Sequence, residues 1–139
     1  MIRNIIAVVV GLIVGSIVNM TLVFLNVFVL YPMPEGTDMM DQEQMNAYIA
    51  TLPQTAFLVT LAAHVGQALV GGWVAARLAP RNAMRPALIV GVLTLLGCIL
   101  NMQNIELPTW MLIELPLCLA AAWFVGQLEQ RRRAGRTAA

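Results

Sequence analysis

Residues 4–30 read NIIAVVVGLIVGSIVNMTLVFLNVFVL and contain no charged side chain. A helix needs roughly 20 consecutive apolar residues to cross a bilayer core about 30 Å thick, so this segment is long enough to span a membrane. It is also longer than the apolar core of a signal peptide, which is usually about 7–15 residues, and we expect a retained helix. Three later segments share its character. Together they predict membrane-spanning helices at about residues 5–30, 54–78, 86–104 and 108–128.

The composition of the whole chain agrees with a membrane protein. Of its 139 residues, 60% are hydrophobic and 11% are charged, and this charged fraction is about half that of an ordinary soluble domain. Inside lipid, a helix satisfies its backbone hydrogen bonds within its own segment. We therefore predict a single all-α domain over residues 1–139, folded as a four-transmembrane-helix bundle.

The charged side chains divide between the two ends of the predicted helices. All eight basic residues are arginines, and they precede the first span, link the second to the third, or follow the fourth. The opposite loops carry acidic residues, namely Glu35, Asp38, Asp41, Glu43 and Glu106. Because basic loops stay in the cytoplasm, we expect both termini there. The arginines form small clusters rather than a broad stripe, so nucleic acid is not an expected partner.

The loop between the first two spans, residues 31–53, is the only sizeable segment outside the predicted membrane region. Thr37 or Asp38 can cap a short helix in it, whose apolar residues recur at helical spacing beside an acidic face. We expect a short amphipathic helix that lies on the outer membrane surface. A lid over a cavity would have the same sequence pattern.

Two parts of the chain resemble each other. GSIVNM at residues 15–20 matches GCILNM at residues 97–102, and the same offset aligns Arg3 with Arg85. His64 and Glu114 each precede a tryptophan by nine residues. These matches predict a tandem repeat of two helical hairpins, related by an axis along the membrane normal.

Polar side chains fall at similar heights in the outer half of the predicted spans. At about 1.5 Å per residue, this layer contains Asn19, His64, Asn101 and Glu114, and Gln67 lies one turn from His64. Ionisable groups at membrane depth usually face the bundle and have a partner. We therefore predict that His64 contacts Glu114, directly or through water, with both asparagines supplying further hydrogen bonds. The layer either fixes helix register or forms a ligand or proton site, and both interpretations stay open.

Small residues along the spans indicate where helices pack closely. We expect Gly11, Gly15, Gly71 and Gly97 at helix contacts. The Gly-x-x-x-Gly pair in the first span could equally join two copies of the chain. Pro116 is expected to kink the fourth helix one turn into its run.

Metal or cofactor chemistry is not expected from the sequence. Cys98 and Cys118 lie inside spans without a Cys-x-x-Cys pair, which favours a role as small packing residues. A b-type haem needs two axial histidines, and only a dimer of this chain could supply them. Zinc or iron catalysis lacks enough ligands. We therefore predict no metal, no cofactor and no catalytic residue.

The stretch GGWVAARLA at residues 71–79 leads through an arginine-bearing turn into a glycine-rich third span. In this motif and in its layout, most of the chain resembles small four-span bacterial inner-membrane proteins that remain uncharacterised. The resemblance implies a four-span shape and a location in the bacterial inner membrane. It implies no activity.

Two classes of function fit these features best. The first is an accessory membrane module or one that binds a lipid or another hydrophobic ligand, with a polar site in the outer half of the bundle. The alternative is a proton-linked small transporter or channel using Glu114 and His64. An enzyme comes third, because a Glu-His pair can do acid-base chemistry but nothing marks a substrate. We expect membrane lipids as partners. The sequence leaves open three further partners, which are a lipid-like small molecule, a second copy of the chain and a larger membrane complex.

Overall fold

The computed structural model describes residues 2–137, and this part of the chain contains helices and no strand. Four of its helices are long and apolar enough to cross a membrane. They cover Ile2–Leu30, Gln54–Leu78, Met84–Asn104 and Thr109–Arg136. The predicted all-α four-helix bundle is therefore confirmed, and the four apolar helices support a multi-pass membrane protein.

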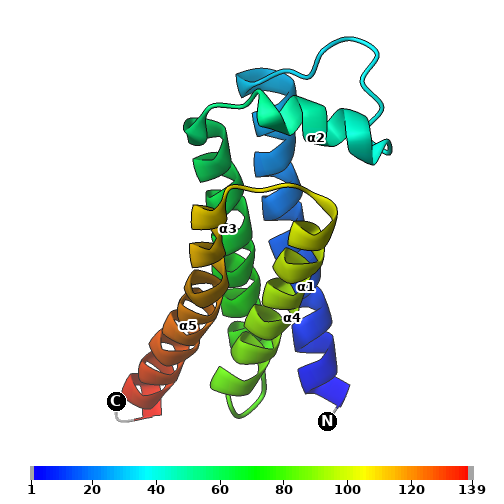
Figure 1. Ribbon diagram of the computed structural model, residues 1–139. Coiled ribbons are helices and arrows are strands. Elements are labelled where there is room, and N and C mark those ends of the chain that lie inside the picture. The colour runs from blue at the N-terminus through cyan, green and yellow to red at the C-terminus, as the bar shows by residue number, and fades with distance from the viewer. Residues whose placement is uncertain (1, 138–139) are drawn as a thin grey trace.

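The long helices lie side by side, with both ends of the chain at the same end of the bundle (Figure 1). A short helix, α2, lies across the opposite end. In chain order the elements are α1 (Ile2–Leu25), a π-helical turn (Asn26–Leu30), α2 (Gln42–Ala50), α3 (Gln54–Leu78), α4 (Met84–Asn104), a 3-10 turn (Thr109–Ile113) and α5 (Glu114–Thr137).

Glycines allow α1 and α3 to approach each other closely. A Cβ atom added at Gly11 would lie 2.5 Å from the carbonyl oxygen of Gly71, and one at Gly15 would lie 2.7 Å from that of Gln67. Neither position has room for a side chain, so these glycines lie at the helix contact. The expectation for Gly97 was wrong, because nothing lies within 4 Å of its Cβ position. Gly97 borders a cavity instead of a neighbouring helix.

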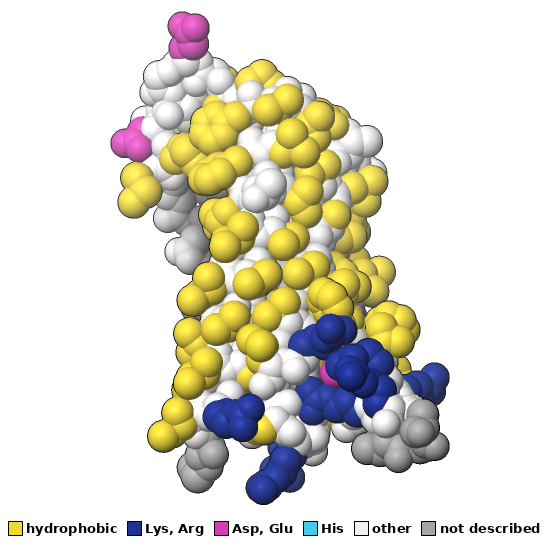
Figure 2. Space-filling view, turned by 180° about the vertical axis from the view of Figure 1, so that it is seen from behind, with side chains coloured by type: hydrophobic (Ala, Val, Ile, Leu, Met, Phe, Trp, Pro, Cys, Tyr) yellow, Lys and Arg dark blue, Asp and Glu magenta, His cyan; other side chains and the backbone are white. Residues whose placement is uncertain are grey.

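The outer surface of the bundle is apolar between two charged ends. Figure 2 shows hydrophobic side chains along the length of the molecule, arginines gathered at one end around an acidic side chain, and further acidic residues at the other end. Ile13, Leu100 and Phe124 are each more than half exposed. Large exposed apolar surfaces are rare on soluble monomers, and here lipid would cover them.

An ion-pair network closes the arginine-rich end. Glu129 is buried and accepts hydrogen bonds from Arg132 and Arg133. Arg133 also donates to the carbonyl oxygens of Ala76 at 2.6 Å and Arg77 at 3.2 Å. The last carbonyl groups of a helix lack hydrogen-bond donors within the helix. Arg133, which lies on α5, therefore supplies donors to the carbonyl groups at the end of α3.

The start of α5 differs from the sequence prediction. A 3-10 turn leads into α5, which begins at Glu114. Pro116 therefore lies in the first turn of α5 and not one turn into a continuous α-helix. The first N–H groups of a helix have no partner within it, so the missing N–H of Pro116 breaks no helical hydrogen bond and need not cause a kink.

Candidate functional site

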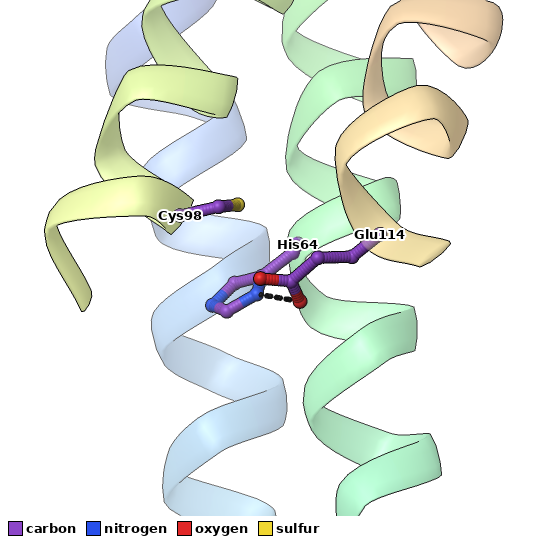
Figure 3. Close-up of side chains that lie close together, drawn as sticks. All are labelled: His64, Cys98 and Glu114. Carbon is purple, nitrogen blue, oxygen red and sulfur yellow. Dashed lines mark hydrogen bonds and ion pairs between the residues drawn. The ribbon is translucent and has the colours of Figure 1, made fainter. Parts of the chain in front are cut away.

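His64 and Glu114 meet inside the bundle. His64 lies on α3, and its Nδ1 atom is 2.7 Å from Oε2 of Glu114 at the start of α5. Glu114 has no exposed surface and His64 is 8% exposed. Figure 3 shows the hydrogen bond between the two side chains. The predicted contact is confirmed as a direct one.

The other carboxylate oxygen of Glu114 lacks a partner. Oε1 is buried, and no group among residues 2–137 forms a hydrogen bond with it. Leaving a buried polar atom unpaired costs about 1–3 kcal/mol, and more for a charged group. The site therefore has an unused acceptor next to the His64 ring.

Cys98 on α4 completes a cluster that the sequence did not predict. His64, Cys98 and Glu114 each offer one potential ligand atom, and these atoms all lie within 4.8 Å of one another. In Figure 3 the three side chains converge from three helices. Cys98 is buried, as expected, and it also borders this polar site. A weak signal existed in the sequence, because Thr94, Cys98 and Asn101 share one face of α4 at helical spacing.

A cavity of about 350 Å³ lies beside the pair, and both His64 and Cys98 line it. At the height of His64 its lining is polar and includes Asn19, Gln67 and Asn101. Towards α2 the lining becomes more apolar, although Asn26 and Tyr48 also border it there. The walls there include Val27, Ile49, Leu52, Phe57 and Leu107.

The amide side chains of the predicted layer line the cavity but do not bond the His64–Glu114 pair. Asn19 donates from Nδ2 to Oε1 of Gln67, which links α1 to α3. No hydrogen bond joins Asn101 to the pair within the described residues. The expectation that both asparagines support the pair was therefore wrong, because Asn19 faces Gln67 across the α1–α3 contact instead.

The short helix α2 covers the cavity. Tyr48 and Ile49 of α2 are buried and line it. The Tyr48 hydroxyl donates to the carbonyl oxygen of Tyr31, and Nε2 of Gln42 donates to the carbonyl oxygen of Asn104 at 2.6 Å. These contacts hold α2 to both sides of the bundle, so it has the position of a lid rather than that of a helix lying apart on the membrane surface.

Comparison with known proteins adds no relative. No protein-family model, no curated protein and no solved structure matches this chain. The resemblance to small four-span bacterial proteins stays a prediction, and a function must be argued from the site itself.

Proposed function

We propose that this protein is a membrane-embedded module that binds a small lipid-like molecule in the cavity beneath α2. The observation that carries this proposal is a lidded cavity of about 350 Å³ inside the bundle. Small-molecule sites usually have volumes of about 300–1,000 Å³, with mostly apolar walls and a few placed polar groups. This cavity fits that description.

The lining also favours one orientation of the bound molecule. Its apolar part would pack beneath Ile49 and Phe57, and its polar end would face Gln67 and His64. His64 already has a carboxylate partner in Glu114, so no unpaired charge is left to hold an ionic head group. A neutral head with a hydroxyl or carbonyl group therefore fits best, because amide side chains can both donate to it and accept from it.

We further propose that the chain lies in a bacterial inner membrane with both termini in the cytoplasm. The arginines gather at the end of the bundle where the chain begins and ends (Figures 1 and 2). Basic residues favour the cytoplasmic side. The cavity and α2 would then lie on the outer side of the membrane.

Mass spectrometry of the gently extracted protein tests the binding function. Gly97→Leu adds a side chain where nothing lies within 4 Å, at the edge of the cavity, and Gly135→Leu adds the same side chain in open space far from it. We expect the wild type and Gly135→Leu to retain one bound molecule each. Gly97→Leu should bind the molecule at least about tenfold more weakly, which corresponds to about 1.4 kcal/mol, and should therefore retain less of it. Equal occupancy in all three proteins, or none in the wild type, would overturn the proposal.

Proton-linked transport through Glu114 and His64 is the competing function. It would give pH-dependent flux of a solute in liposomes, abolished by Glu114→Gln. A binding module gives no such flux, and it retains its ligand whether or not a pH gradient is present. The same liposome preparation therefore separates the two functions.

A further inference from the structure

We propose that His64, Cys98 and Glu114 form a binding site for a divalent transition-metal ion of the zinc class. One nitrogen, one sulfur and one oxygen ligand atom lie within 4.8 Å of one another. They come from α3, α4 and α5, and their side chains point toward a common space (Figure 3). The site is thus assembled by the tertiary fold and not by a local motif.

The chemistry of the donors favours zinc over the harder cations. Magnesium and calcium prefer oxygen ligands, whereas imidazole and thiolate ligands suit zinc. Three protein ligands with one open position are the usual arrangement of catalytic zinc sites. The ligand set also balances charge, because a thiolate and a carboxylate offset a divalent ion. A neutral centre avoids the cost of placing net charge within the spans.

An independent observation points to a missing ligand. Oε1 of Glu114 is buried without a hydrogen-bond partner among residues 2–137, and the residue has no exposed surface. The buried Oγ1 of Thr94, one turn before Cys98 on α4, also has no partner there. Buried polar atoms are nearly always satisfied, so the unpaired carboxylate oxygen within the cluster, beside an unpaired hydroxyl that lines the same cavity, indicates an occupant.

The present geometry needs only side-chain adjustment to hold the ion. With metal–ligand bonds of about 2.0–2.3 Å, tetrahedral ligands lie roughly 3.3–3.7 Å apart. The His64–Glu114 contact of 2.7 Å would widen by about half an ångström, and the Cys98 sulfur, which lies within 4.8 Å of both other ligand atoms, would approach the ion by rotation of its side chain. Metal–sulfur, metal–nitrogen and metal–oxygen bonds form. The thiol proton and the proton shared by His64 and Glu114 leave to solvent, so the net charge of the site does not change.

His64 and Cys98 both line the cavity, so the fourth position of the metal would face it. The polar end of the bound molecule could then complete the coordination. This last step rests on the proposed function, whereas the three-ligand site does not.

Cobalt titration of the full-length protein in detergent micelles, after treatment with a chelator, tests the site. Cobalt(II) is the probe because a cobalt–thiolate bond gives a charge-transfer absorption that zinc can then displace. We expect one equivalent to bind to the wild type with this absorption, and zinc to abolish it. Cys98→Ser should lose the absorption, and Glu114→Gln should bind more weakly. Cys118→Ser is the matched control, because Cys118 packs against Cys98 but is not one of the three ligand residues, and this variant should keep the cobalt–thiolate absorption.

The absence of the absorption in the wild type would overturn the proposal, as would its loss in Cys118→Ser but not in Cys98→Ser. Circular dichroism of each variant shows whether the helices remain folded, and Glu114→Gln tests the site independently if Cys98→Ser unfolds. Mass spectrometry of the same samples keeps the two proposals apart. Protein that retains its small molecule but binds no cobalt contradicts only the metal site, and the reverse result contradicts only the proposed function.

Discussion

The Nδ1 atom of His64 lies 2.7 Å from Oε2 of Glu114, although 50 residues separate them in the chain. The pair joins the middle of α3 to the first turn of α5, beside the cavity. Both side chains are buried, so neither can replace its partner with bulk water if the other is removed. The same pair therefore contributes to the stability of the bundle and forms part of the site.

Removing only one member of the His64–Glu114 pair should strongly lower the stability of the protein. We expect His64→Ala to lower the free energy of unfolding by about 3–5 kcal/mol, because it leaves Glu114 buried and unpaired. Glu114→Gln should cost less, since the amide carries no charge. The double variant should cost less than the sum of the two single changes. Unfolding by sodium dodecyl sulfate in mixed micelles measures all three, and strictly additive losses would show that the residues do not interact.

Two glycine-to-alanine changes should differ sharply. Gly11→Ala places a Cβ atom 2.5 Å from the Gly71 carbonyl oxygen, so α1 and α3 must separate. We expect a loss of about 1–3 kcal/mol, as is typical of overpacking. Gly97→Ala has open space and should be neutral or stabilising by up to about 1 kcal/mol, since alanine favours helix. The same unfolding assay measures both, and equal losses would contradict the close approach of α1 to α3.

Glu129 should matter more than the arginines around it. Its side chain is fully buried, whereas that of Arg132 is 38% exposed. We expect Glu129→Ala to lower the free energy of unfolding by about 1–3 kcal/mol, because Arg133 loses the group that orients it toward the end of α3. Arg132→Gln, the control, should cost less than Glu129→Ala, because exposed ion pairs contribute little to stability. A larger loss for the arginine variant would contradict this ranking.

The lid should loosen in acid. Asp41 caps α2 by accepting hydrogen bonds from the backbone N–H groups of Gln44 and Glu43, and these bonds with the Gln44 side chain lower its pKa below 3.8. A lowered pKa means that the cap contributes its full stability above pH 3.8 and loses it as the pH falls through the folded value. A spin label at the exposed Met40 should therefore become more mobile below that pH.

The matched variant for this test is Asp41→Asn. Asparagine can still cap a helix but does not titrate near this pH, so mobility should then no longer change with acid in this range. An unchanged acid response in Asp41→Asn would assign the effect to another carboxyl group.

The spans and the His64–Glu114 contact could be predicted from sequence because few alternative helix positions and few alternative partners were available. Apolar runs set the helix positions locally. His64 is the only basic side chain in the outer half of the predicted spans, which left Glu114 a single partner of this kind there. Similar heights in the outer half of the spans were then enough to predict the pair.

Other parts of the site depend on rotations and long-range contacts that an apolar helix does not encode. The rotation of α4 about its axis turns Cys98 toward His64, and neighbouring apolar residues specify that rotation only weakly. The lid position depends on the contact between Gln42 and Asn104, which lie 62 residues apart. The open space at Gly97 also depends on how the helices are arranged around the cavity. From sequence alone, a glycine in a membrane helix is expected at a helix contact, because its neighbours in space are not known.

An experimental density map of the wild-type protein in lipid nanodiscs tests the binding function most directly. We predict one elongated density in the cavity, with its polar end within hydrogen-bond distance of His64 or Gln67 and its apolar part beneath Ile49 and Phe57. A cavity closed by those side chains, or one holding only ordered water, would contradict the proposed function.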